Sequence, residues 1–155
     1  MEIIPMTAEH TAALAELEQL CFSRPWSRKA LVEELENPAA VFLTAVEEKE
    51  VLGYAGMHCA WGECYLDNIA VFPEHRRQGV AKALLLELEN RAKRRNGEFL
   101  SLEVRASNRE AIALYQAMGF QEAGRRKNFY TAPQEDGLIF TKYFSEENQK
   151  NQGFE

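Results

Sequence analysis

Two segments of the sequence carry residue types suited to chemistry. In VFPEHRRQGVAKALL, residues 71–85, three basic side chains precede Gly79, and a helical pattern begins at once. In FLSLEVRAS, residues 99–107, Glu103 faces away from the apolar residues of a predicted strand, and Tyr115 follows on the next predicted helix. The first segment is suited to anion binding and the second to proton transfer.

The glycine-led helix start offers an anion site in an otherwise acidic chain. The first turn of a helix exposes unpaired backbone N–H groups and the positive end of the helix dipole, where phosphate groups bind. Gly79 permits close approach of the backbone, and Arg76, Arg77 and Lys82 add positive charge. A solvated basic turn is the alternative that spacing alone leaves open. The segment matches neither a P-loop nor a Gly-x-Gly-x-x-Gly fingerprint.

Glu103 and Tyr115 form the candidate acid–base pair. Apolar residues alternate on one face of the predicted strand, so Glu103 points to the other, near the strand end where open α/β sheets form ligand sites. A carboxylate can accept a proton, and a phenol with an ordinary pKa of about 10 can donate one. The alternatives are a salt bridge, for instance of Glu103 with Arg105, and a tyrosine ring packed in the core.

The composition describes an acidic protein with one domain. The chain has 155 residues, a formal net charge of −6, 46% hydrophobic and 27% charged residues. This charge argues against binding to nucleic acid or to a membrane. The sequence begins without a signal peptide and has no apolar run long enough to span a bilayer. Three cysteines, Cys21, Cys59 and Cys64, exclude a complete disulfide framework, so we expect a cytoplasmic protein.

Residue type and period predict the strands. Three of them form an antiparallel meander, a strand–helix–strand order around residues 79–96 predicts a parallel pair, and the last two form a hairpin across Pro133 to Gly137. The predicted strands are Glu2 to Ile4, Val41 to Val46, Val51 to Cys59, Cys64 to Val71, Phe99 to Val104, Phe120 to Tyr130 and Leu138 to Phe144.

Four segments have the period of a helix. The first two begin after the capping residues Thr7 and Ser27, the third spans residues 79–96, and the fourth starts at a capping box of Ser107 and Glu110. The inner face of the first helix is predicted to consist of Leu14, Leu17 and Leu20.

Two motifs resemble those of the GCN5-related N-acetyltransferase (GNAT) family. RRQGVA, residues 76–81, matches the family's Gln/Arg-x-x-Gly-x-Gly/Ala signature, and NREAIALYQAMGF, residues 108–120, resembles its Asn-x-x-Ala-x-x-Leu-Tyr-x-x-x-Gly-Phe segment. The resemblance implies a mixed α/β (α+β) fold with a mostly antiparallel sheet of about seven strands, about four helices and a splayed strand pair. We expect one N-acetyltransferase domain over residues 1–144 and a polar tail over residues 145–155.

The resemblance implies acetyl-coenzyme A as cosubstrate and no metal. The pyrophosphate would bind backbone amides of the glycine-led turn, and the pantetheine arm would pair with a strand that family members bend by a β-bulge, here near Asp67-Asn68. The implied cofactor-binding residues are Ile69, Ala70, Val71, Arg77, Gln78, Gly79, Val80, Ala81, Lys82 and Asn108. The histidines and cysteines have no standard zinc spacing, and a nucleophilic cysteine is disfavoured.

The resemblance also implies catalytic roles. Glu103 would take the proton from an acceptor amine, Tyr115 would donate one to the departing thiolate, and a backbone N–H near Val71 would meet the oxyanion. Pro25-Trp26-Ser27 and the last hairpin resemble the bacterial RimI type within the family, the ribosomal-protein-alanine N-acetyltransferases. Gly137 departs from the hairpin sequence of that type.

The expected function is therefore transfer of acetyl to a protein N-terminal amine, most of all the N-terminal alanine of a small-subunit ribosomal protein. The expected partner is a peptide N-terminus, and the chain is expected to be a monomer or weak dimer. Two alternatives stay open: an acetyltransferase for a small cationic amine, such as a polyamine or aminoglycoside, and a non-catalytic subunit that binds acetyl-coenzyme A.

Overall fold

A computed structural model of the chain describes residues 1–145, so the predicted tail from residue 146 onward lies outside the described residues. Over the described range the strands form one mixed sheet in the order β1-β2-β3-β4-β5-β7-β6. The strands are β1 Glu2–Pro5, β2 Ala40–Glu47, β3 Glu50–Ala60, β4 Glu63–Val71, β5 Phe99–Arg105, β6 Gln121–Thr131 and β7 Gln134–Tyr143. The helices are α1 Thr11–Cys21, α2 Arg28–Glu34, α3 Val80–Arg94 and α4 Arg109–Ala117, with short 3-10 turns at Ala8–His10 and Pro73–His75. The predicted seven strands and four helices are confirmed within this range.

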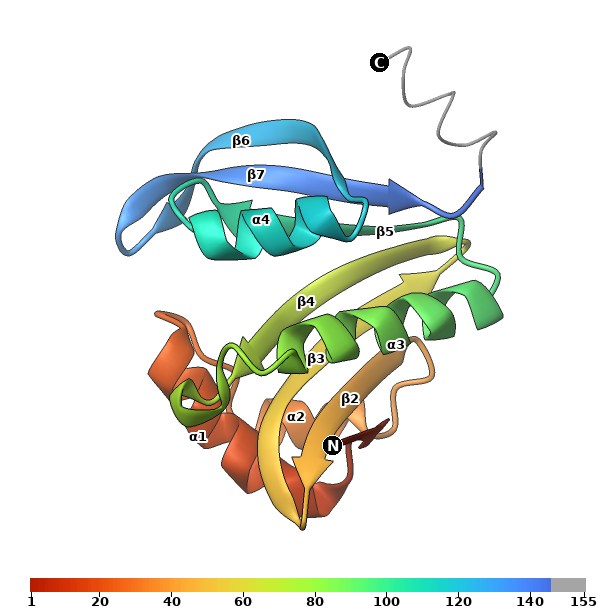
Figure 1. The fold of residues 1–155 in the computed structure, drawn as a ribbon, viewed down its shortest axis with the longest axis vertical. Helices are drawn as coiled ribbons and strands as arrows, with labels where there is room; N and C mark the ends of the chain where they lie inside the picture. The colour runs from red at the N-terminus through yellow and green to blue at the C-terminus, as the bar shows by residue number, and fades with distance from the viewer. Residues whose placement is uncertain (146–155) are drawn as a thin grey trace.

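The sheet divides where β4 meets β5. These two strands are parallel and pair only from Glu63–Tyr65 to Phe99–Ser101, whereas all other neighbouring strands run antiparallel. Figure 1 shows the result: β1 to β4 with α1, α2 and α3 form one half, and β5 to β7 with α4 form the other. The halves meet at one end of β4 and β5 and diverge toward the other.

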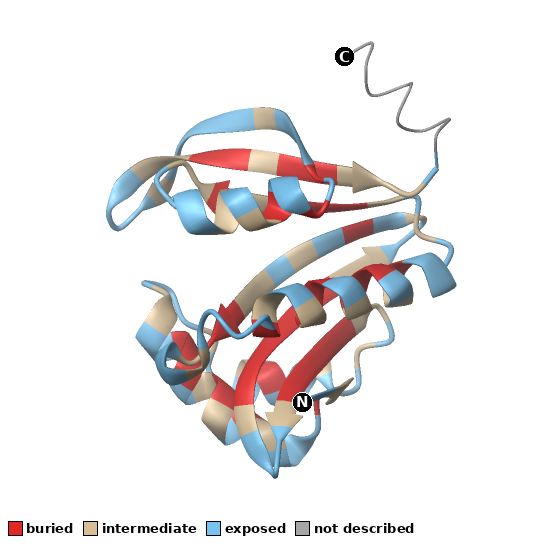
Figure 2. Cartoon of the chain, in the orientation of Figure 1, coloured by how far each residue is buried: buried red, intermediate tan, exposed pale blue. Residues whose placement is uncertain are grey.

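Two apolar clusters form the core, and the one beneath α3 continues into the other half of the molecule. On one face of the sheet α3 contributes Val80, Leu84 and Leu88, which are buried against β2, β3 and β4. On the opposite face α1 and α2 pack Leu14, Leu17 and Leu31 against Phe42 and Tyr54. Figure 2 shows buried residues along the strands between these helices and along one stripe of α3. Each buried leucine contributes about 2–5 kcal/mol against truncation to alanine.

Three local predictions were wrong. Leu20 is 60% exposed, because the inner stripe of α1 continues from Leu14 through Leu17 and Glu18 to Cys21 and leaves position 20 on the outer side. Ser107 does not cap α4; the Asn108 side chain does, accepting a hydrogen bond from the Ala111 N–H at 3.2 Å. The last hairpin turns at Ala132-Pro133, so Gly137 lies within β7.

Among the residues that the structure describes, none of the helices is both long enough and apolar enough to cross a bilayer.

Candidate functional site

A β-bulge in β4 causes the strand to bend away from β5. Gly56 of β3 pairs with Asn68 and Met57 pairs with Leu66, so Asp67 is the extra residue. Such a bulge increases the local twist and interrupts pairing. Beyond Tyr65 the edge of β4 that faces β5 has no partner strand among the described residues. The bulge that the family resemblance implied at Asp67-Asn68 is therefore present.

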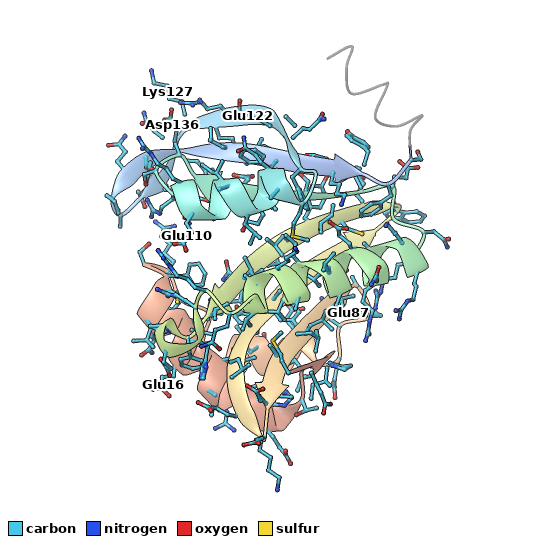
Figure 3. All side chains as sticks on the ribbon, viewed as in Figure 1. Glu16, Glu87, Glu110, Glu122, Lys127 and Asp136 are labelled. Carbon is cyan, nitrogen blue, oxygen red and sulfur yellow. The ribbon has the colours of Figure 1, made fainter. Side chains whose placement is uncertain are left out.

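The divergence of β4 and β5 opens a cleft of about 1120 Å³. Its walls come from both halves of the molecule: β4, the turn before α3 and the end of α1 on one side, and β5, α4 and the β6–β7 hairpin on the other. Figure 3 shows the labelled Glu110 at the start of α4, on the side of that helix turned toward the larger half. Of the predicted site residues, all but Gln78 line the cleft: Ile69, Ala70, Val71, Arg77, Gly79, Val80, Ala81, Lys82, Glu103, Asn108 and Tyr115.

The start of α3 presents free backbone amides to this cleft. Gly79 is the N-cap residue with a φ of 80°, in the left-handed region that favours glycine. Ala83 donates the first helical hydrogen bond, to the Gly79 carbonyl at 3.0 Å. The N–H groups from Val80 to Lys82 therefore precede the helical ladder, as at every helix start. A Cβ on Gly79 would meet no protein atom within 4 Å, so the space in front of the turn is open.

The basic residues of this turn have different roles. The Arg76 guanidinium donates to the Val71 carbonyl at 3.1 Å and contacts Cys21 Sγ at 3.5 Å, so it ties the turn to β4 and α1. Arg76 also lines the cleft and its partners are uncharged, so its positive charge remains beside the turn, as expected. Arg77 and Lys82 line the cleft, and within residues 1–145 neither forms an ion pair.

Glu103 has one carboxylate oxygen without a partner. Its Oε1 lies 3.4 Å from Arg126 Nε, whereas Oε2 is buried and has no hydrogen-bond partner among the described residues. The alternative pairing with Arg105 is wrong, because Arg105 is engaged by Glu135 at 3.4 Å and lies 4.4 Å from the Tyr130 ring centroid. A buried unsatisfied acceptor costs about 1–3 kcal/mol. Such an atom in a cleft marks a place for a donor from a ligand.

Tyr115 is held as a protonated phenol at the wall of the cleft. It is buried, with its ring centroid 5.9 Å from that of Phe120 and 6.5 Å from that of Phe140. Burial, followed by the charge that Tyr130 would carry, raises the pKa of Tyr115 to about 12. The side chain therefore keeps its proton near neutral pH, as a proton donor must.

The connection between α1 and α2 reaches the β6–β7 hairpin across the cleft. Arg24 Nη2 donates to Thr131 Oγ1 at 3.1 Å, which joins the two halves at their open end. The segment Pro25-Trp26-Ser27 leads into α2, and the Ser27 hydroxyl caps that helix by accepting from the Ala30 N–H at 3.1 Å, as expected. The Trp26 ring packs 5.5 Å from Phe42.

One polar residue at the base of this connection, Glu18, escaped the sequence analysis. Glu18 is fully buried, and its Oε1 accepts from the Trp26 N–H and the Asn68 side chain, both at 2.9 Å. The available signal was position, because Glu18 follows Leu14 by one helical period and so lies on the apolar stripe of α1. An acidic residue there predicts a buried partner.

The cysteines and histidines do not gather around one point. Cys59 and Cys64 are opposite one another on β3 and β4, and all three thiols are free. Within the described residues, the three-ligand grouping with metal-like spacing is the surface set Glu50, Glu74 and His75. It lies outside the lining of the cleft except for His75, whose Nε2 is 3.0 Å from Glu50.

Comparisons with known proteins agree with the fold and the cleft. The model of the acetyltransferase (GNAT) family matches residues 11–120. A protein of Escherichia coli (strain K12) named [ribosomal protein bS18]-alanine N-acetyltransferase is 36% identical over 129 residues, covering 82% of this chain and 86% of its own length. The protein of that name from Salmonella typhimurium is 38% identical over 127 residues, covering 80% of this chain and 84% of its own.

A solved structure has the same architecture over almost its whole length. The ribosomal-protein-S18-alanine N-acetyltransferase from Escherichia coli superimposes with a TM-score of 0.84 at 34% identity, covering 93% of this chain and 94% of that one. The family model covers well over half of the sequence and the relatives exceed 30% identity over most of their length. This chain belongs to the acetyltransferase (GNAT) family.

Proposed function

We propose that this chain transfers acetyl from acetyl-coenzyme A to the α-amine of a protein N-terminus, and that its acceptor is the N-terminal alanine of the ribosomal protein bS18. The names of the relatives from Escherichia coli and Salmonella typhimurium support this acceptor. The single observation that carries the reaction type is the partnerless, buried Oε2 of Glu103 in the same cleft as the glycine-led start of α3.

The cleft fits acetyl-coenzyme A, which supplies the activated acetyl thioester. The amides from Val80 to Lys82 and the open space before Gly79 suit a pyrophosphate, with Arg77 and Lys82 as counter-charges. The edge of β4 past Tyr65 lacks a partner strand within residues 1–145, so an extended pantetheine arm can pair with the backbone of Ile69 to Val71. Asn108 lines the opposite wall of the cleft, where its Oδ1 caps α4.

The side chains around the reacting amine have distinct tasks. The acceptor arrives as an ammonium, which must lose a proton before nitrogen can attack, and an α-amine with a pKa of about 8 needs only modest assistance. Glu103 Oε2 accepts this proton, directly or through one water, and Arg126 at 3.4 Å holds the other oxygen in place.

Tyr115 acts on the sulfur as negative charge develops there. Its pKa of about 12 exceeds the ordinary thiol value of about 8.5, so complete proton transfer to a thiolate is uphill. The phenol therefore stabilises the leaving sulfur first by hydrogen bonding, and its position matters more than its acidity. Direct attack within a ternary complex needs no covalent enzyme intermediate.

A competition between acceptors tests the proposal. The purified protein is given acetyl-coenzyme A with a library of peptides that differ at the first residue, and products are identified by mass spectrometry. We expect alanine-initiated peptides to dominate and N-terminally blocked peptides to be inert. Faster turnover of spermidine or an aminoglycoside would favour the small-amine alternative, and tight binding without thiol release for any acceptor would favour a non-catalytic subunit.

A further inference from the structure

Three titratable side chains, joined by hydrogen bonds, extend from α2 to the cleft. Glu34 Oε2 on α2 lies 2.9 Å from His58 Nε2 on β3, and His58 Nδ1 is hydrogen-bonded to Asp67 Oδ2 on β4. None of the three belongs to the acid–base pair or to the predicted cofactor site. The imidazole uses both ring nitrogens, so its orientation is fixed from both sides.

The bulge determines where Asp67 points. Along β4, Leu66 and Ile69 pack into the cluster beneath α3, while Asn68 contacts Glu18 of α1 on the opposite face. Asp67 is the inserted residue, and its bond to His58 directs it to the α1–α2 face too. Asp67 and Asn68 are consecutive, yet both side chains point to the same face of the sheet. In a regular strand, consecutive side chains point to opposite faces, so the bulge accounts for this arrangement.

Asp67 and Glu103 lie on opposite walls of one cleft and on the same face of the sheet. Leu102 and Val104 join the cluster beneath α3, so Glu103 between them faces the α1–α2 side. Both carboxylates line the cleft, one from β4 and the other from β5. An acceptor amine that enters between the diverging strands therefore has one carboxylate on each side of the cleft.

One oxygen of Asp67 remains for a ligand. Oδ2 is bonded to His58, whereas Oδ1 has no partner among the described residues, and the side chain is 26% exposed. Burial raises the pKa of Asp67, although the neighbouring His58 acts to lower it. For His58, burial acts to lower the pKa, but the hydrogen bond with Glu34 and the charge of Asp67 outweigh it, and the pKa is raised. A cationic ligand would offset the cost of burying this carboxylate by pairing with its charge.

We propose that Asp67 binds the ammonium group of the acceptor opposite Glu103, and that His58 and Glu34 act as positioning residues that hold the Asp67 carboxylate in place. This inference rests on the proposed function, since it concerns the acceptor amine of that reaction. Asp67 recognises the positive charge of the acceptor ammonium, and Glu103 removes the proton from it.

The test compares two peptide ligands that differ only in the ammonium. Calorimetry measures binding of an alanine-initiated peptide, and of its des-amino analogue with a propionyl group in place of alanine, to the complex with coenzyme A. Coenzyme A carries no acetyl group, so no turnover intervenes. The wild-type protein should prefer the amine. Asp67→Asn, which keeps the shape of the side chain, should reduce that preference at least about tenfold.

A matched control separates this effect from a general loss of charge. Glu63 also lies on β4 but is exposed, and it accepts from the Tyr65 hydroxyl at 2.7 Å. Glu63→Gln should leave the preference for the amine unchanged. If Asp67→Asn binds coenzyme A normally and keeps the wild-type preference, the inference is overturned.

A second variant tests the positioning role and guards against a folding defect. Glu34→Gln changes the end of the Glu34–His58–Asp67 series that lies away from the cleft. Coenzyme A binding should therefore be unchanged, and the preference for the amine over the des-amino peptide should fall about threefold. Because Glu34 acts through Asp67, the double variant should match Asp67→Asn alone, and additive losses would contradict this. A wild-type protein that acetylates no peptide would overturn the proposed function itself, whereas an active wild type with unaltered Asp67→Asn preference overturns this inference alone.

Discussion

The side-chain amide of Asn68 on β4 donates to both carboxylate oxygens of Glu18 on α1, at 2.9 and 3.2 Å. Glu18 also accepts from the Trp26 N–H, so a single buried carboxylate joins the bulged strand to the segment that borders the cleft. The bulged part of β4 is therefore hydrogen-bonded to α1, which packs on the sheet beside it. These contacts stabilise the geometry of the bulge in addition to the strand pairing.

Glu18→Ala should destabilise the fold by about 1–3 kcal/mol, because it leaves two buried donors without an acceptor. The free energy of unfolding from urea titration measures this effect. Glu16→Ala, on the same helix but outside the buried set, is the matched control and should stay within about 0.5 kcal/mol of wild type. Equal stability of the two variants would contradict a structural role for the Glu18 contacts.

The same carboxylate predicts a pH dependence. Burial raises the pKa of Glu18, and hydrogen bonds from the Trp26 N–H and the Asn68 side chain offset only part of this rise. A raised folded-state pKa means that the contribution of Glu18 is fully present below the unfolded value of about 4.3 and falls as pH rises through the folded value. Glu18→Gln should therefore be less damaging near neutral pH than in acid, as measured by urea unfolding at several pH values. The opposite trend would show that ionised Glu18 is favoured in the folded protein.

Gly79→Ala should weaken coenzyme A binding by about tenfold, since an L-residue at a φ of 80° is strained by about 1–2 kcal/mol and its Cβ enters the open space before the turn. Isothermal titration calorimetry measures the affinity. Gly124→Ala provides a control in β6, because a Cβ there meets only the end of Ile139 at 3.5 Å. Undiminished affinity of Gly79→Ala would remove the turn from the binding site.

Tyr115→Phe should lower kcat by about 10²-fold or more at every pH between 6 and 10, with coenzyme A affinity little changed. The factor should be constant because burial raises the pKa of Tyr115 to about 12, so the phenol stays protonated over this range. Single-turnover rates against pH provide the measurement. If the wild-type rate falls at high pH and this fall is absent in Tyr115→Phe, Tyr115 ionises well below a pKa of about 12, which would contradict its role as a protonated donor over this range.

The elements were predictable from the sequence because their signals are local. The alternation of residues 99–104 and the period of residues 80–94 each specify one element, and the glycine at position 79 specifies the turn between strand and helix. Local rules failed where two neighbours compete. Ser107 and Asn108 are both good caps, but the Asn108 side chain accepts from the Ala111 N–H, while the Ser107 N–H donates to Glu135 of β7.

The rest of the site depends on contacts between distant segments. Glu34, His58 and Asp67 are brought together by α2, β3 and a bulge whose register no single-strand pattern reveals. The pairing of Glu103 with Arg126 instead of Arg105 likewise follows from the position of β6 beyond β7. Residue type could nominate Glu103, but only the assembled sheet leaves its Oε2 without a partner.

The most direct measurement is the turnover of Glu103→Gln on an alanine-initiated peptide, with coenzyme A affinity measured on the same preparation. Gln keeps the shape of the side chain and cannot act as a carboxylate base, so kcat should fall by about 10²–10⁴-fold while the affinity stays within about twofold of wild type. Wild-type turnover in this variant would contradict the assignment of Glu103 as the proton acceptor and, with it, the reaction assigned to the cleft.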